Sequence, residues 1–180
     1  MPLPFSGIVG QSDAIERIRR AIAHDRLPAA FLLCGPEGTG KRSAALALAA
    51  RLLCESAGEF DACGRCGACR RIEASTHPDL HLLVPDGETL RIEPMRELLA
   101  ALRLRAYEGG WKIALIDGAE KMNASAANAF LKTLEEPGLR TLFLLVAVNE
   151  SLLPPTLASR CQKLRFAPLA EEVVVSLLTE

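Results

Sequence analysis

Four apolar runs of strand length recur along this chain, and a shorter fifth segment of the same kind follows them. The longest runs are nearly continuous in apolar residues rather than alternating, which is typical of strands buried on both faces of a sheet. Strands that alternate with helices of about 10 to 15 residues predict an open, mostly parallel sheet covered on both faces. We therefore expect an α/β fold with strands at Ala29–Cys34, Asp79–Val84, Lys112–Asp117, Thr141–Val148 and Gln162–Phe166.

Helical periodicity fills the segments between these runs. Isoleucines recur at helical spacing between Ser12 and His24, and an Ala/Leu-rich stretch covers Lys41–Leu53. Two further helices are expected over Met95–Leu104 and Ala124–Leu134. With 180 residues, 49% of them hydrophobic, the chain is long enough to bury one substantial core.

Charge and aromatic content exclude several function classes. The formal net charge is −1, so the surface as a whole has no field for phosphates, and only 4% of residues are aromatic, which is too few for a base-stacking platform. No apolar stretch approaches the roughly 20 residues of a membrane-spanning helix. The first residues also lack the basic and apolar regions of an export signal. We expect a cytoplasmic protein without a membrane partner.

The segment Gly35–Lys41 reads Gly-Pro-Glu-Gly-Thr-Gly-Lys and lies between an expected buried strand and an expected helix. In this context glycines let consecutive backbone N–H groups turn toward a phosphate, and the lysine adds a charge. The pattern predicts a loop of nucleotide-binding ancestry. Its candidate binding residues are Gly35, Gly38, Thr39, Gly40, Lys41 and Arg42. Arg42 stands where such loops carry the hydroxyl that ligates Mg²⁺, so ATP or ADP binding and its loss both stay open.

The third expected strand ends in Asp117, an arrangement that puts a carboxylate beside the metal in such NTPases. The alternative is an ordinary aspartate that caps the following turn. Hydrolysis usually needs a second acid next in sequence, but that residue is Gly118, and Glu120 comes later. The missing hydroxyl and the missing acid argue against ATP hydrolysis by this chain. The rival hypothesis is an active ATPase that uses Lys41, Asp117 and Glu120.

Four of the six cysteines, Cys54, Cys63, Cys66 and Cys69, lie close together in the sequence. Spacings of two residues let neighbouring thiolates converge on one tetrahedral ion. In a cytosolic chain this clustering favours a structural zinc site over disulfides, a redox dithiol or an iron–sulfur cluster. A zinc-stabilised nucleic-acid module is a third functional hypothesis, which the charge balance and scarce aromatics disfavour.

Taken together, several motifs resemble the AAA+ subunits of the bacterial DNA polymerase III clamp loader over nearly the whole chain. They are the loop Gly35–Lys41, the four cysteines, the stretch Asn123–Pro137 and Ser159-Arg160-Cys161. The sequence His77-Pro78-Asp79, the glycine after Asp117 and Arg42 resemble the delta-prime branch of these subunits more than the gamma/tau branch.

The resemblance implies a RecA-like AAA+ P-loop domain over residues 1–167, with a parallel five-stranded sheet and a zinc module inserted at about 54–70. It also implies that residues 168–180 begin a helical lid domain that is truncated here.

The role that the resemblance implies is that of a clamp-loader subunit of the DNA polymerase III holoenzyme, a DNA-directed DNA polymerase and nucleotidyltransferase. Such a subunit acts as a stator, and Arg160 would serve in trans as an arginine finger during ATP-dependent loading of the sliding clamp onto primed DNA. Asn149 stands at the position that family members use to sense the γ-phosphate. The implied partners are the gamma/tau and delta subunits in a hetero-oligomer, the sliding clamp and primed DNA.

Overall fold

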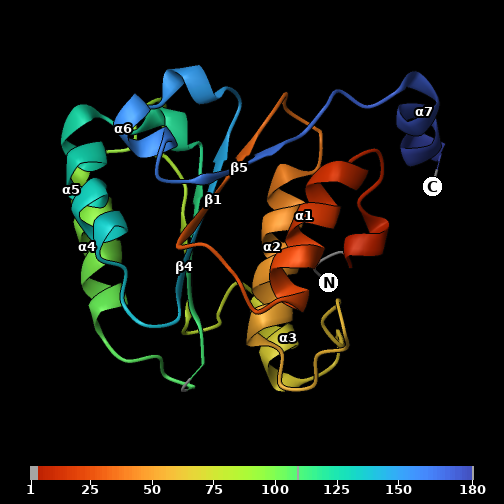
Figure 1. Ribbon diagram of the computed structural model, residues 1–180, viewed down its shortest axis with the longest axis horizontal. Helices are drawn as coiled ribbons and strands as arrows, with labels where there is room; N and C mark the ends of the chain where they lie inside the picture. Colours follow the sequence, from red (N-terminus) through yellow and green to blue (C-terminus); the bar gives the residue numbers. More distant parts are fainter. Residues whose placement is uncertain (1–3, 109, 180) are drawn as a thin grey trace.

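A five-stranded sheet runs through the centre of the computed structural model, which describes residues 4–108 and 110–179 (Figure 1). Its strands are β1 (Ala30–Cys34), β2 (Leu80–Leu83), β3 (Lys112–Asp117), β4 (Thr141–Ala147) and β5 (Gln162–Arg165). They lie in the order β2-β3-β4-β1-β5, and all neighbouring pairs are parallel. The predicted α/β class and the parallel five-stranded sheet are confirmed.

Helices cover both faces of the sheet, because parallel strands need crossover connections that return the chain to the same edge (Figure 1). One face carries α1 (Ser12–Ala23), α2 (Lys41–Leu53) and α3 (Gly67–Glu73), and the other carries α4 (Ile92–Arg103), α5 (Ala124–Glu135) and α6 (Pro155–Ala158). The described loops contain three short 3₁₀ helices, η1 (Phe5–Gly7), η2 (Ala119–Lys121) and η3 (Glu150–Leu152). None of the helices in the described part of the chain is both long and apolar enough to cross a bilayer.

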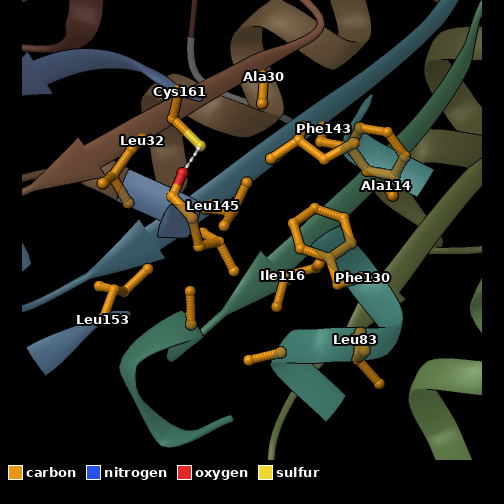
Figure 2. Close-up of a cluster of buried hydrophobic side chains, with 14 of the residues drawn as sticks. Ala30, Leu32, Leu83, Ala114, Ile116, Phe130, Phe143, Leu145, Leu153 and Cys161 are labelled. Carbon is orange, nitrogen blue, oxygen red and sulfur yellow. Dashed lines mark hydrogen bonds between the residues drawn. The ribbon is translucent and has the colours of Figure 1, made fainter. Parts of the chain in front are cut away.

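The core consists of two hydrophobic clusters, one on each face of the sheet. On β1, Leu32 packs into the cluster beneath α4 and α5, whereas Phe31 and Leu33 pack into the cluster beneath α1 and α2. Figure 2 shows the first cluster, where the rings of Phe130 and Phe143 pack in a T-shaped, edge-to-face arrangement with centroids 4.9 Å apart. Every residue of β1 and β4 is buried, which explains why their apolar runs show no alternation.

After β5 the chain leaves the sheet and forms α7 (Glu171–Thr179), which stands apart from both helix layers (Figure 1). Its Val174, Val175 and Leu177 are exposed. The helix expected after Pro168 is therefore present. Its assignment to a lid domain stays a prediction.

Candidate functional site

A cleft of about 520 Å³ opens where the carboxyl ends of β1, β3 and β4 meet. The predicted residues that line it are Gly38, Thr39, Gly40, Lys41, Arg42 and Asp117. The other lining residues are Glu37, Ser43, Val84, Pro85, Gly118, Glu120, Lys121, Val146, Ala147 and Val148. The cleft forms here because the carboxyl ends of parallel strands share one edge of the sheet, which is where open α/β sheets bind ligands. The topology thus brings the glycine loop and Asp117 together as predicted.

Gly35 begins the loop but does not line the cleft. A Cβ atom added at this position would lie 2.1 Å from the carbonyl oxygen of Phe166, which follows β5. Glycine is therefore required here by the close approach of a second backbone. The packing of this backbone against the segment after β5 requires glycine at position 35, independently of any ligand that the loop binds.

Lys41 turns back onto the loop that precedes it. Its Nζ donates to the carbonyl oxygen of Gly35 at 2.7 Å and also to that of Pro36, and the residue is only 6% exposed. Burial lowers the pKa of this ammonium, while nearby acids, Glu37 first, oppose the shift. The lysine thus stabilises the loop in this structure, and a phosphate would have to draw its ammonium away from those carbonyls.

Arg42 and Asp117 form an ion pair across the cleft, with Nη1 and Oδ2 3.0 Å apart. The carboxylate that should face a metal ion is therefore neutralised by the residue that replaces the metal-ligating hydroxyl. A divalent cation bound at Asp117 would have to displace the guanidinium. The residue that replaces the metal-ligating hydroxyl thus also occupies the carboxylate that the NTPase pattern retains.

The strand that ends at Asp117 turns sharply at Gly118, whose φ of +76° lies in the left-handed region. A Cβ here would lie 3.1 Å from Cγ of Pro85, so an acidic residue at 118 would be strained and crowded. Glu120 does line the cleft, and its Oε2 is buried without a hydrogen-bond partner among the described residues. Glu120 therefore places a carboxylate in the cleft, although position 118 itself carries no acid.

Asn149 does not line the cleft. It follows β4 at the same edge of the sheet, is exposed, and its Oδ1 accepts the backbone N–H of Ser151 at 2.9 Å, which caps η3. The structure therefore gives Asn149 a local capping contact. A role in sensing phosphate stays a prediction.

Arg160 lies at the opposite edge of the sheet from the cleft. Gln162, at the start of β5, pairs in register with Phe31 near the start of β1, so Arg160 precedes the amino ends of the strands while the loop follows their carboxyl ends. Its side chain is 42% exposed, lies 2.9 Å from Glu135 of α5 and donates to the carbonyl oxygen of Thr156 at 2.8 Å. Arg160 cannot reach its own cleft from this position.

The four clustered cysteines converge between α2 and α3. Their sulfur atoms all lie within 4.8 Å of one another, and those of Cys54 and Cys66 are 3.8 Å apart. Four sulfurs bound at about 2.3 Å to one tetrahedral ion have edges of about 3.8 Å, so the spacing fits such an ion. All four are free thiols. The cluster could hold a metal ion, as the sequence predicts.

The four thiols of this cluster differ in how readily they lose their protons. Backbone N–H groups, that of Arg65 first, lower the pKa of the Cys63 thiol to about 6, whereas burial raises the pKa of Cys69 to about 12. Because metals bind the thiolate, Cys63 is already a thiolate at neutral pH, whereas Cys69 must release its proton when a metal binds. A metal ion held by all four sulfurs would have no open position for a reacting ligand.

Comparison with known proteins agrees with this geometry. The model of the family described as DNA polymerase III, delta subunit, matches residues 10–170. The chain belongs to this family. The delta-prime subunit of DNA polymerase III from Pseudomonas aeruginosa is 45% identical over 134 residues, covering 73% of this chain and 41% of that protein.

Other relatives fall on both branches of the clamp-loader proteins. The delta-prime subunit from Bacillus subtilis is 38% identical over 94% of this chain and 51% of its own length, and the tau subunit from Salmonella typhimurium is 33% identical over 96% and 27%. The higher identities lie with delta-prime, which confirms that this chain is a delta-prime member of the delta-subunit family. The chain spans about half the length of the delta-prime relatives.

Solved structures confirm the AAA+ fold. A DNA polymerase III gamma-subunit-related protein from Thermotoga maritima superposes with a TM-score of 0.66 at 24% identity, covering 89% of this chain and 48% of that one. The RuvB Holliday junction branch migration motor from the same organism has a TM-score of 0.58 at 16% identity, over 92% and 47%.

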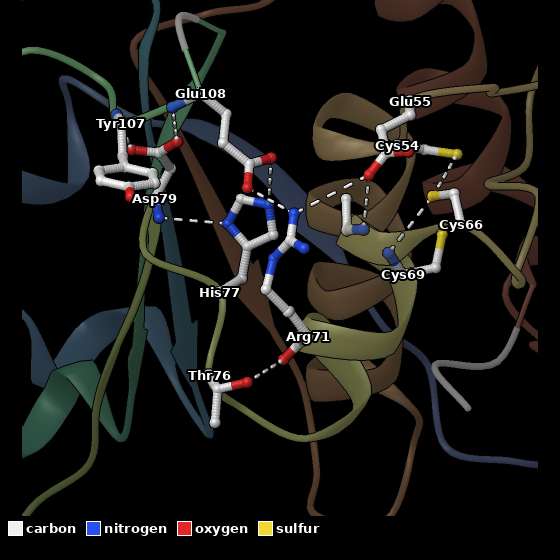
Figure 3. Close-up of polar contacts among 11 residues, drawn as sticks. Cys54, Glu55, Cys66, Cys69, Arg71, Thr76, His77, Asp79, Tyr107 and Glu108 are labelled. Carbon is white, nitrogen blue, oxygen red and sulfur yellow. Dashed lines mark hydrogen bonds and ion pairs between the residues drawn. The ribbon is translucent and has the colours of Figure 1, made fainter.

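In this delta-family chain, His77 and Asp79 of the His77-Pro78-Asp79 motif lie at the centre of a polar network (Figure 3). The carboxylate of Asp79 accepts the backbone N–H groups of Tyr107 at 2.6 Å and Glu108 at 3.0 Å. Glu108 in turn forms an ion pair with Arg71 of α3. The network ties the cysteine cluster to the loop between α4 and β3. The one sequence signal was the motif itself, because its partners are about 30 residues away.

His77 lies buried within this network, and its burial favours the neutral imidazole. It is 3% exposed, and its Nδ1 accepts the backbone N–H of Asp79 at 3.1 Å, so that nitrogen must carry no proton. The remaining proton belongs on Nε2, which lies 3.4 Å from Glu108. Burial lowers the pKa of the imidazole, against an opposing effect of Glu108.

We predict that this histidine makes the fold sensitive to acid. Below the ordinary histidine pKa of about 6.5 the unfolded chain binds a proton that the folded chain refuses, so stability falls as pH falls from 7 to 5. His77→Gln should reduce this slope, measured by urea unfolding at each pH, whereas replacement of the exposed His24 by Gln should not. An unchanged slope in His77→Gln would show that the ring does not carry the effect.

Proposed function

We propose that this chain is the AAA+ part of a clamp-loader delta-prime subunit that binds no catalytic Mg-ATP itself and instead completes the ATP site of a neighbouring subunit. The observation that carries the proposal is the Arg42–Asp117 ion pair, which stands in the cleft where a magnesium ion would lie. The cleft keeps the shape of a nucleotide site but has lost its metal chemistry. A rigid subunit of this kind acts as a stator.

The position of Arg160 supports a role outside its own chain. A guanidinium is permanently charged and planar, and in trans it can stabilise the charge that develops on a transferred phosphoryl group. Arg160 lies at the amino edge of the sheet and is partly exposed, held by one carboxylate and one carbonyl oxygen. On assembly, the γ-phosphate in the neighbouring subunit would replace Glu135 as the partner of the Arg160 guanidinium. We propose that this neighbour is an ATP-bearing gamma/tau subunit.

The donor set supports zinc as the metal of the cysteine cluster. Four thiolates at tetrahedral spacing suit zinc, which is redox-inactive and four-coordinate in structural sites. The residues that would hold it are Cys54, Cys63, Cys66 and Cys69. The metal would cross-link the segment 54–70 and would take no part in a reaction. We also propose a cytoplasmic location, where thiols are kept reduced.

The remaining parts of the proposal follow from the family. The chain would occupy a fixed place in a hetero-oligomer with gamma/tau and delta subunits, and through that assembly would help load the sliding clamp onto primed DNA for a DNA polymerase holoenzyme. Within the chain, residues 1–167 form the RecA-like domain, and residues 168–180 begin the lid.

One observation favours the rival hypothesis of an active ATPase of the gamma/tau type. The unpaired, buried carboxylate oxygen of Glu120 lies in the cleft and could orient a water molecule. Rotation of Arg42 away from Asp117 would then be required before a metal could bind. The next experiment distinguishes the two functions.

We predict that the isolated full-length protein does not hydrolyse ATP, and that Arg42→Thr raises its affinity for Mg-ADP about tenfold or more without giving turnover. The substitution frees Asp117 and restores the hydroxyl, but Gly118 still supplies no acid. Binding is measured by calorimetry with and without Mg²⁺, and replacement of the exposed Arg26 by Thr is the matched control. Turnover by the unmodified protein that Lys41→Ala abolishes would refute the proposal.

A further inference from the structure

A second cavity, larger than the nucleotide cleft, lies at the opposite edge of the sheet. It has a volume of about 930 Å³ and opens between the carboxyl-terminal ends of α4 and α5, beside the first residues of β3 and β4. Two loops complete it, one after α4 and one between α5 and β4. Its lining residues are Leu99, Leu102, Arg103, Leu104, Arg105, Ala106, Gly110, Lys112, Lys132, Thr133, Glu136, Gly138, Leu139, Arg140 and Thr141. We call this cavity the amino-edge pocket.

The amino-edge pocket concentrates positive charge on a chain that is close to neutral overall. Four exposed cations line it, and within residues 4–108 and 110–179 none of them has an ion pair or a side-chain hydrogen bond. They are Arg103, Arg105, Lys132 and Arg140. Glu136 is the single acid of the described lining. Arg42, Arg71 and Arg160 each have a carboxylate partner, whereas these four exposed cations gather around one cavity without such a partner among the described residues.

A fifth cation fixes the floor of the pocket. Lys112 is 8% exposed, and its Nζ donates to the carbonyl oxygens of Leu102 and, at 2.9 Å, of Leu104, at the end of α4. This contact holds the loop after α4 in place with its arginines toward the opening. The loop that carries Arg103 and Arg105 is thus tied to Lys112, the first residue of β3.

The pocket also offers apolar surface to a ligand. Leu99 and Leu102 form part of its wall, while Leu104 and Leu139 at its rim are 69% and 94% exposed. Exposed leucines next to a cavity are typical of a protein interaction site. The described lining contains no aromatic side chain on which a nucleic-acid base could stack. Cations combined with aliphatic walls match a peptide better than a phosphate backbone.

We propose that the amino-edge pocket binds an acidic peptide segment with aliphatic side chains, contributed by a partner protein. The carboxylates would meet the four free cations, and the aliphatic groups would cover Leu104 and Leu139. Charge complementarity would set the register and the association rate, while burial of the leucines would add affinity. The site is separate from the nucleotide cleft and from the cysteine cluster, and goes beyond the proposed function.

The test uses the full-length protein and a fluorescein-labelled 12-residue probe peptide of alternating Asp and Leu, followed by fluorescence anisotropy. We expect saturable binding that weakens as salt rises, because the contacts are exposed ion pairs. The double variant Arg105→Glu/Arg140→Glu changes only loop residues and should weaken binding at least tenfold. Replacement of Arg26, an exposed arginine outside the pocket, by Glu should change the affinity less than about twofold. Unfolding midpoints verify that both variants are folded.

Four results would overturn the proposal. The first is no binding of the probe, and the second is binding that the double variant leaves unchanged. The third is equal binding of a peptide with Ser in place of Leu, which would make the site a general polyanion site. The fourth is binding of a single-stranded oligonucleotide through the same arginines with no binding of the peptide, which would assign the surface to nucleic acid.

Discussion

Replacing Arg160 with alanine in a complete clamp loader should sharply slow clamp- and DNA-stimulated ATP hydrolysis and clamp loading, while folding, zinc content and assembly stay intact. An arginine supplied to a neighbouring phosphate is worth about 10³ to 10⁵ in rate in well-studied NTPases, and the loss should fall on the one ATP site that this chain completes. Hydrolysis measured in a single turnover isolates that site from product release. The side chain is partly exposed, and its polar partners are the exposed carboxylate of Glu135 and the carbonyl oxygen of Thr156, so its removal should not destabilise the sheet.

Two further variants test whether the planar guanidinium of Arg160 is needed and whether loss of another exposed arginine has the same effect. Arg160→Lys should restore little activity, because an ammonium lacks the planar fork of a guanidinium. Arg165→Ala is the matched control, since Arg165 lies at the carboxyl end of β5, the strand that Arg160 precedes, and is also exposed. A normal loading rate in Arg160→Ala would make Arg160 an ordinary surface residue.

The second large effect is expected from the cysteine cluster. Purified protein should contain one zinc ion per chain without added metal, and Cys66→Ser should lose it, because structural zinc sites contribute about 10 to 16 kcal/mol at pH 7. Hydrogen exchange should then speed up in residues 54–70 and change little in β1 and β4, whose residues are buried in the main core. Elemental analysis and exchange measured by mass spectrometry provide the two readouts.

Cys161→Ser tests whether any cysteine would give the same result. Cys161 is buried in the hydrophobic cluster beneath α4 and α5, far in sequence from the four ligands, and its Sγ donates to the carbonyl oxygen of Leu157 at 3.3 Å (Figure 2). This variant should retain its zinc. Metal-free protein, or disulfides among the four cysteines, would contradict the assignment.

The sheet could be predicted from the sequence because its strands are buried on both faces. Continuous apolar runs mark such strands directly, and the glycine loop and the cysteine cluster are local patterns with spacings that carry their geometry. α3 and α6 could not be predicted in the same way. α3 has seven residues and begins inside the cysteine-rich segment, and α6 has only four, so neither shows a helical period.

Contacts between distant segments were the part of the site that the sequence could not provide. Arg42 and Asp117 are 75 residues apart, and only the parallel strand order brings them to one edge. Their sequence positions indicated a lost hydroxyl at Arg42 and a retained carboxylate at Asp117, but not that the arginine neutralises the carboxylate. The amino-edge pocket is built in the same way, from loops that are unremarkable in the sequence and adjacent only in the fold.

The most direct test of the account compares two variants of this chain inside one reconstituted clamp loader. Lys41→Ala removes the central side chain of its own cleft, and Arg160→Ala removes the group offered to a neighbour; single-turnover ATP hydrolysis is measured for each. The account predicts that Lys41→Ala hydrolyses ATP at the rate of the unmodified complex and that Arg160→Ala is strongly slowed. The reverse pattern, with Lys41→Ala slowed and Arg160→Ala normal, would mean that this chain hydrolyses ATP in its own cleft.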